Sequence, residues 1–244
     1  MGQAKLFTIL ENNPSVMNHL ARTLGLDPSL SFYDVYSLTD PDLIAFIPRP
    51  VHALLVIIPL TEGWHRERKA EDEGKGEYEG KGEDEPVIWF KQTIGNACGS
   101  IGLTHCLLNS EAADHITPGS TLDQICKDAL PKGMHERAKV LEDSEAFEKA
   151  HEEAAALGDS AAPTPEAGRH TGQHFVAFVK GKDNHLWELE GSRTGPLDQG
   201  LLGEDEDVLS STAIERGLGR LIKAEAEKGG DLRFSAIALA ANLD

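Results

Sequence analysis

One stretch of eight residues limits the folds open to this chain. Residues 53–60 read Ala-Leu-Leu-Val-Ile-Ile-Pro-Leu, a continuous apolar run that lies close after Pro50. A run without polar alternation, bounded by prolines, is typical of a strand that is buried on both faces. It therefore predicts a central strand. With 244 residues and 40% hydrophobic content, the chain fits one large domain with a full core, so residues 1–244 need not be divided into two.

The rest of the chain supplies further strands and several helices. Residues 173–180 and 185–190 are apolar stretches separated by Gly181-Lys182-Asp183-Asn184, a pattern that predicts a β-hairpin. Shorter strands are predicted at 31–36 and 234–240. Helical patterns or composition cover residues 12–24, 41–47, 122–130, 136–156 and 210–226. The chain is thus predicted to belong to the α/β (α+β) class.

The charge of the chain restricts its partners. A net charge of −18, from 23 Lys and Arg against 41 Asp and Glu, disfavours nucleic acid and anionic membranes and favours a basic polypeptide. The sequence contains no apolar run near the ~20 residues of a membrane span and no signal-peptide pattern. Three cysteines do not form a disulfide framework, which favours a reducing compartment. We expect a soluble, cytoplasmic monomer.

Residues 67–85 differ in composition from the rest of the chain. They are rich in Lys, Glu, Asp and Gly, and Ala70 is their only aliphatic residue. Such a segment buries too little apolar surface to order itself. We therefore predict a mobile charged insertion here, with an acidic arm for a basic partner as the alternative.

The stretch from Gln92 to Asn109 carries a candidate nucleophile. Cys98 follows the turn formers Gly95 and Asn96 and opens an apolar, helix-like segment, so it is predicted to lie in the first turn of a helix. There the free N–H groups and the helix dipole lower the pKa of a thiol. The side-chain amide of Gln92 and the Cys98 N–H are candidate donors for an oxyanion hole. A lone cysteine is more often a small buried apolar residue, and the neighbouring residues favour the catalytic interpretation.

The predicted hairpin carries the candidate partners of this thiol. His174 and Glu190 lie near the outer ends of its two strands, so their side chains can meet across the sheet. A carboxylate on one ring nitrogen would fix the tautomer and leave the other nitrogen to take the Cys98 proton. The plain alternative is a structural strand histidine. His170 and His174 have the spacing of helical zinc ligands, but they lie in a loop entering a strand, and we expect neither a metal nor a cofactor.

This nucleophile segment strongly resembles that of the ubiquitin C-terminal hydrolase family, whose motif is Gln-Thr-Ile-x-Asn-Ala-Cys-Gly followed by an apolar helix. Other blocks similar to the family follow in the same order along the chain: Asn13-Pro14-Ser15-Val16, Asp34-Val35-Tyr36, Pro48-Arg49-Pro50-Val51, residues 53–60 and Phe234 to Leu243. The match is broken mainly by residues 67–85.

The resemblance implies a papain-like cysteine protease fold, with a central antiparallel sheet flanked by helices, and a knotted chain, which is rare among proteins. It also implies a thiol-dependent deubiquitinase that removes small adducts or peptide extensions from the C-terminal glycine of ubiquitin. An acyl-thioester would form on Cys98, and the partner would be ubiquitin or a related ubiquitin-like modifier. Residues 157–172 match the family's crossover loop, which limits the size of what can thread through the active site.

One residue departs from the family pattern. The family usually ends the second hairpin strand with Glu-Leu-Asp-Gly, and this chain has Glu188-Leu189-Glu190-Gly191. The extra methylene displaces the carboxylate by about 1 Å, a change that can cost about 10²-fold in rate. Glu188, on the same strand face, is a weaker candidate for the same role. The alternatives to the hydrolase are a catalytically weakened ubiquitin-binding protein and an unrelated cysteine acyl-transfer enzyme.

Overall fold

The computed structural model describes residues 5–158, 172–228 and 230–243. Its centre is a six-stranded sheet in the order β1-β6-β2-β3-β4-β5, and all neighbouring strands are antiparallel. The strands are β1 (Leu30–Asp34), β2 (Ala53–Pro59), β3 (Gln173–Lys180), β4 (His185–Leu189), β5 (Leu197–Leu201) and β6 (Ser235–Ala241). The apolar run at 53–60 forms β2 in the middle of the sheet, which confirms the prediction of a central strand.

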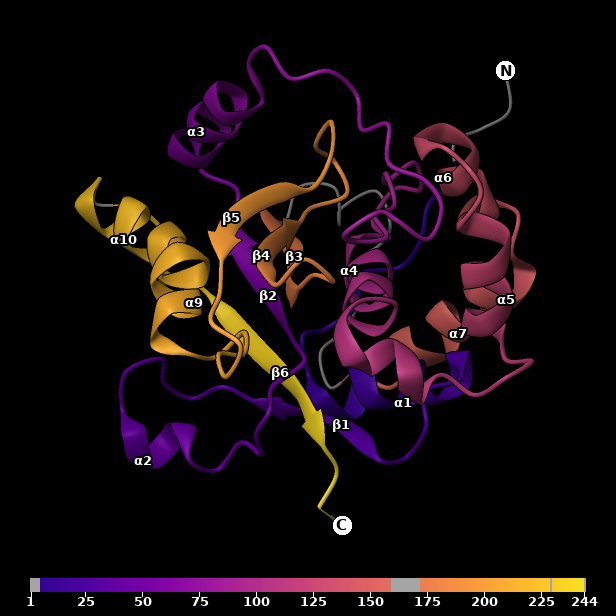
Figure 1. Cartoon of the computed structure of the whole chain (residues 1–244), viewed down its shortest axis with the longest axis horizontal. Helices are drawn as coiled ribbons and strands as arrows, with labels where there is room; N and C mark the ends of the chain where they lie inside the picture. Colours follow the sequence, from indigo (N-terminus) through magenta and orange to yellow (C-terminus); the bar gives the residue numbers. More distant parts are fainter. Residues whose placement is uncertain (1–4, 159–171, 229, 244) are drawn as a thin grey trace.

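Helices cover both faces of this sheet (Figure 1). Alternate residues of β2 enter two separate hydrophobic clusters, with Leu55 in one and Leu54 and Val56 in the other. The larger cluster is formed with α1 (Pro14–Leu24), α4 (Cys98–Leu107), α5 (Thr121–Ala129), α6 (Met134–Glu142) and α7 (Glu145–Ala155). The smaller one is formed with α3 (Glu62–Asp72), α9 (Ser211–Arg216) and α10 (Leu218–Glu227), near the short α2 (Pro41–Ile44). The fold is α/β, with an antiparallel sheet flanked by helices, as predicted.

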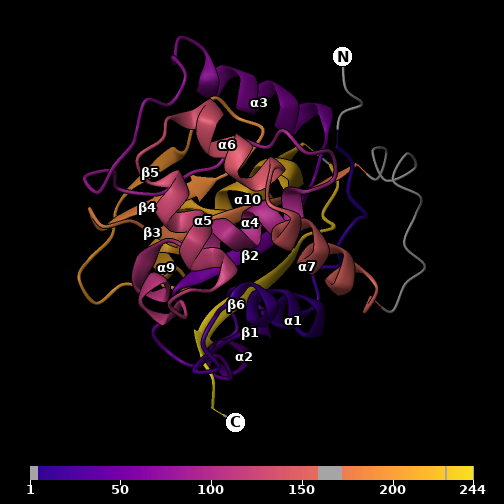
Figure 2. The ribbon, with the colours of Figure 1, turned by 90° about the vertical axis from the view of Figure 1, so that its right-hand side faces the viewer.

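Helix α4 lies inside the molecule, between the sheet and the outer helices (Figure 2). Every one of its residues after Cys98 is buried. Gly102 permits this close approach, because a Cβ at this position would lie 2.8 Å from Cδ1 of Leu55 on β2. The helix that begins at Cys98 is therefore fixed firmly against the sheet.

Several predicted boundaries need correction. The predicted helix at 136–156 is two helices, because Ser144 caps a new helix by accepting a hydrogen bond from the N–H of Phe147. The predicted helix at 210–226 is likewise divided at Gly217. Strand β5 was not predicted. It is an edge strand whose sequence, Leu-Asp-Gln-Gly-Leu, has no apolar alternation, so backbone pairing with β4 creates the strand without a hydrophobic pattern.

The charged segment at 67–85 is more ordered than its composition predicts. Residues 67–72 belong to α3, where Thr61 caps the N-terminus and Trp64 is buried. Salt bridges from Glu71 and Asp72 to Arg193 also hold this helix to the rest of the protein, so long-range ion pairs replace apolar burial. Residues 73–85, all of which the structure describes, contain only turns and irregular chain. The predicted lack of structure is wrong for residues 67–72, and the mobility of the remainder stays a prediction.

The predicted crossover loop at 157–172 lies almost wholly outside the described residues, which exclude 159–171. The knot also stays a prediction, because the described residues leave out 159–171. In the part of the chain that the structure describes, none of the helices has the length and hydrophobicity to cross a membrane.

Candidate active site

Cys98 is the first residue of α4, as the sequence predicts. No side chain caps this helix, so the backbone N–H groups of its first turn are available to an anion. Asn96, two residues earlier, has a left-handed backbone with φ of 60°, and its amide donates a hydrogen bond to the carbonyl of Phe7. This turn leaves the Cys98 thiol half-buried at the start of the helix.

The imidazole of His174 lies between this thiol and a carboxylate. His174 is on β3, opposite Ile58 of β2, and is nine-tenths buried. Its Nε2 lies 2.5 Å from Oε1 of Glu190, and its side chain interacts with the Cys98 thiol, which raises the pKa of the imidazole. With Nε2 occupied by the carboxylate, Nδ1 is the nitrogen left for Cys98. The thiol, imidazole and carboxylate therefore form one continuous chain.

This contact favours charge separation between the thiol and the imidazole. Burial opposes a thiolate at Cys98, but the hydrogen bond and charge of His174, with the N–H groups of Phe175 and Gly99, lower the pKa of the thiol. Burial also opposes a charged His174, yet the charge of Glu190 and the hydrogen bonds that the imidazolium donates to Cys98 and Glu190 raise the pKa of the imidazole. Both shifts favour a thiolate beside an imidazolium over the neutral pair.

Glu190 follows directly after β4 and is fully buried. Its Oε1 accepts hydrogen bonds from the backbone N–H of Ser192 at 2.8 Å and from the Ser192 hydroxyl at 2.5 Å. Its Oε2 lies 3.2 Å from Nε of Arg68, an ion pair without hydrogen-bond geometry. Burial alone would raise the pKa of this carboxyl group. The charge and hydrogen bond of His174, together with the charge of Arg68, outweigh burial, so the pKa lies below its usual value. The side chain that is one methylene longer than the family's Asp thus contacts His174 and Ser192 through Oε1 and pairs with Arg68 through Oε2.

Gln92 lies beside the same end of β4. Its backbone N–H donates to the carbonyl of Gly191 at 2.7 Å, and its side-chain Nε2 donates to the carbonyl of Ile94 at 3.2 Å. That bond uses one N–H of the amide and leaves the second for another acceptor. A Cβ on Gly191 would lie 3.0 Å from the Cβ of Gln92, so a glycine is needed for this close approach. The structure thus brings all four predicted site residues to one end of the sheet.

Arg68 on α3 is the site residue that the sequence did not reveal. Besides its ion pair with Glu190, its guanidinium donates to the backbone carbonyl of Ser192 and lies over the ring of Trp64, 5.2 Å from the ring centroid. The available signal was the spacing of Trp64 and Arg68, which are four residues apart and so share one helix face. A single large aromatic residue ahead of a charged stretch is a hint of such a face.

A buried ion network supports this end of the sheet. Arg193 pairs with Glu71, with Asp72 at 2.8 Å and with Glu188 at 3.7 Å. Arg220 of α10 joins Glu71 and Glu188, each at 2.8 Å. Burial raises the pKa of Glu188 while both arginines oppose the shift. Glu188, the weaker candidate for orienting His174, is therefore engaged with arginines instead.

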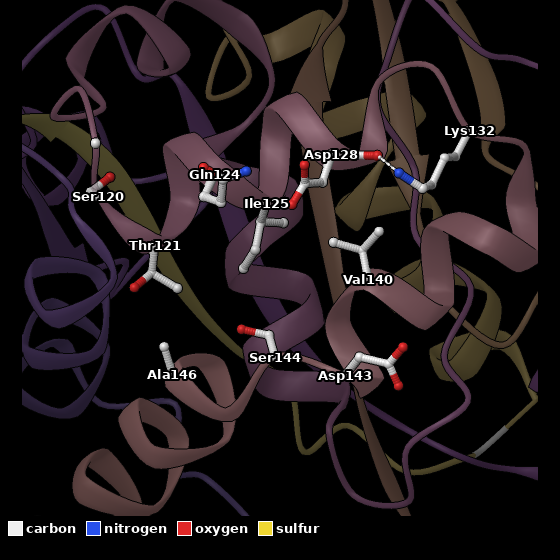
Figure 3. A pocket seen from close by; sticks show the side chains of 11 residues that line it. Ser120, Thr121, Gln124, Ile125, Asp128, Lys132, Val140, Asp143, Ser144 and Ala146 are labelled. Atoms are coloured by element: carbon white, nitrogen blue, oxygen red, sulfur yellow. Dashed lines mark hydrogen bonds between the residues drawn. The ribbon is translucent and has the colours of Figure 1, made fainter.

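The structure also contains a hollow of about 670 Å³ between α5, α6 and α7 (Figure 3). Its walls include Ile125, Val140 and Asp128, and the backbone carbonyl of Asp128 accepts a hydrogen bond from Lys132. None of the four predicted site residues lines it. Among residues 5–158, 172–228 and 230–243, no cluster of His, Cys, Asp or Glu side chains suits a metal ion. The candidate chemistry is therefore concentrated at Cys98.

An antiparallel sheet flanked by helices, with a thiol, an imidazole and a carboxylate in contact at one end, defines the class of cysteine hydrolases. Residues 7–222 match the model of the family described as ubiquitin carboxyl-terminal hydrolase, family 1. The chain belongs to this family and is a cysteine-type ubiquitin hydrolase.

Individual relatives match along almost the whole chain. Ubiquitin carboxyl-terminal hydrolase 3 of Arabidopsis thaliana is 36% identical over 240 residues, covering 97% of this chain and 94% of the relative. Isozyme L1 of Homo sapiens is 33% identical over 230 residues, covering 94% and 96%. The solved catalytic domain of Trichinella spiralis UCH37, bound to ubiquitin vinyl methyl ester, is similar in fold, with a TM-score of 0.72 and 21% identity over 99% of this chain and 97% of that one.

Proposed function

We propose that the chain hydrolyses the bond between the C-terminal glycine of ubiquitin and a small leaving group or short peptide extension. The observation that carries this proposal is the continuous contact from Cys98 through His174 to Glu190. The names of the relatives and the ubiquitin vinyl methyl ester bound to the Trichinella domain support ubiquitin as the partner. Under this proposal the chain acts as a monomer in the cytoplasm, and a related ubiquitin-like modifier is an alternative substrate.

The proposed reaction begins with the Cys98 thiolate. It attacks the carbonyl carbon of the glycine, and the oxyanion that forms is held by the Cys98 N–H and the amide of Gln92. The imidazolium of His174 then gives its proton to the leaving amine, and a thioester remains on Cys98. His174 next takes a proton from water, which attacks the thioester and releases the free carboxylate. Glu190 keeps the imidazole oriented through both steps.

The alternative is a ubiquitin-binding protein in which Glu190 has weakened the catalytic site. The geometry supports the hydrolase instead, because Oε1 of Glu190 reaches Nε2 of His174 at 2.5 Å and also accepts from Ser192, while Oε2 forms an ion pair with Arg68. A misplaced carboxylate would be expected to miss this contact. A hydrolase and a weakened ubiquitin-binding protein should differ in turnover and should have similar affinity for ubiquitin.

The test is incubation with ubiquitin that carries a fluorogenic amide at its C-terminus, with Cys98→Ala as the control. We expect release by the unmodified chain, and a loss of release in Cys98→Ala with its ubiquitin affinity retained. Binding without release by the unmodified chain would support the binding protein. Absence of both binding and release would favour the unrelated acyl-transfer enzyme.

A further inference from the structure

The segment that leads to Gln92 is buried but belongs to no sheet. Residues 88–92, all of them described, are neither helical nor in a strand, while Trp89 and Phe90 are fully buried. Buried backbone N–H and C=O groups outside secondary structure need other partners, because an unpaired buried polar group destabilises the fold. The position of Gln92 therefore depends on which groups satisfy this segment.

Side chains at the far end of the nucleophile helix supply these partners. Nε2 of His105 accepts a hydrogen bond from the backbone N–H of Phe90 at 2.9 Å. Asn109, just beyond the helix, accepts from the N–H of Ile88 at 2.8 Å and donates to its carbonyl at 3.0 Å. The buried segment is thus bonded at Phe90 to α4 and at Ile88 to the residue just beyond its end.

The spacing of these residues matches the geometry of the helix. His105 is seven residues after Cys98, close to two full turns of 3.6 residues, so one face of the helix presents both the thiol and His105. Asn109 lies beyond the last residue of the helix, and its amide donates a hydrogen bond to the carbonyl of His105. A single rigid element sets the distance between the nucleophile and the segment that ends at Gln92.

His105 also has the correct chemical state for this contact. It is fully buried, and burial lowers its pKa to about 3 despite the opposing effect of Glu190. The ring is therefore neutral, and because Nε2 accepts from Phe90, the proton is on Nδ1. That proton lies towards the carbonyl of Leu189, the residue before Glu190, without close hydrogen-bond geometry. The ring thus lies between the two segments that carry Gln92 and Glu190.

We propose that His105 is a positioning residue that holds the oxyanion donor Gln92 in register with Cys98 through the backbone of Phe90. The inference rests on the proposed hydrolase function. On its other side Gln92 is fixed by the carbonyl of Gly191. Loss of the bond from His105 frees Phe90, the bonded residue nearest to Gln92 on this side, while Arg137 still holds Trp89 and Asn109 still holds Ile88. The expected effect is on the stabilisation of the oxyanion, while the thiolate and its imidazole partner keep their contact.

The test compares His105→Leu, which removes the acceptor, with His105→Gln, which can still offer an oxygen to the Phe90 N–H. With fluorogenic ubiquitin, His105→Leu should lower kcat by about 10- to 100-fold with little change in KM, since a displacement near 1 Å costs rates of this order. His105→Gln should recover most of kcat. Cys106→Ala, in the next position of the same buried helix, is the matched control and should keep kcat within about twofold.

Alkylation by iodoacetamide separates the positioning role from general damage. In that reaction the sulfur–carbon bond forms as iodide leaves, and no carbonyl oxygen gains charge, so an oxyanion donor is not needed. His105→Leu should therefore be alkylated at Cys98 at the normal rate, and it should have little further effect in a Gln92→Ala background.

Three outcomes would overturn the inference. An unchanged kcat in His105→Leu would show that Phe90 does not need this anchor. Parallel losses of kcat and alkylation would show that the variant damages the whole site. Absence of release by the unmodified chain would overturn the proposed function and this inference together, whereas release by that chain with either of the first two results overturns the inference alone.

Discussion

Helices α3 and α4 both contribute to the candidate site, but they are held in place by different forces. Helix α4 is apolar, and all of its residues after Cys98 are buried between the sheet and the outer helices. Helix α3 is strongly charged, and Trp64 is its one buried residue. Helix α4 carries the Cys98 thiol at its start. Helix α3 carries Arg68, which pairs with Glu190, the carboxylate that contacts His174.

The difference shows that a catalytic constellation can combine hydrophobic and electrostatic support. On α3, the side chains of Arg68, Glu71 and Asp72 are spaced by three and four residues, so they share one face, and this face meets Glu190 and Arg193. Changes on α3 should therefore act through charge, with effects on the pH profile. Changes on α4 should act through packing and through the position of Gln92.

The largest effect on stability is expected from Arg193→Met. The guanidinium is almost fully buried and balances Glu188 as well as the two acids of α3, so its removal leaves buried carboxylates with too little positive charge. Breaking such a buried pair costs about 3–5 kcal/mol in the free energy of unfolding. Urea denaturation measures this loss. Arg233→Met, at an exposed pair with Asp231, is the control, and an equal loss in both variants would contradict the assigned role of the network.

The next effect is expected from Glu190→Asp. The shorter side chain withdraws from His174, Ser192 and Arg68 together, so the rate should fall by about 10²-fold with ubiquitin affinity retained. Steady-state release from fluorogenic ubiquitin measures kcat and KM separately. A rise in kcat would instead mean that the glutamate is misplaced in the unmodified chain.

A smaller effect is expected from Arg68→Gln. Loss of one ion pair at a site with other donors should lower kcat by about 10-fold, on the order of 1.4 kcal/mol. Without the charge of Arg68, Glu190 acts more strongly on His174 and raises the pKa of the imidazole further, so the alkaline limb of kcat against pH should move to higher pH. Lys69→Gln removes the same charge from an exposed neighbour. Equal profiles for the two variants would exclude a specific role for Arg68.

The same contrast explains what the sequence could predict. Helix α4 and strands β2 and β3 were predictable because their apolar residues form local patterns. The segments around these elements also allowed the selection of four candidate site residues: Cys98, Gln92, His174 and Glu190. The structure brings these four residues together, and their catalytic roles stay predictions. The position of α3 depends on pairs such as Arg68 with Glu190, which are far apart in sequence, and no local pattern reveals such a pair. Strand β5 was missed because its pairing with β4 is not accompanied by an apolar face.

The central claim is that His174 makes Cys98 a thiolate, and the pH dependence of alkylation tests it most directly. The rate of Cys98 modification by iodoacetamide is measured across pH in the unmodified chain and in His174→Gln, with Cys98→Ala to subtract reaction at Cys106 and Cys126. Because the pKa of Cys98 is lowered, reactivity should persist below the usual thiol pKa of ~8.5 and be lost only as pH falls through the lowered value. In His174→Gln the midpoint should move up by about one unit or more. Equal midpoints in the two proteins would contradict the account.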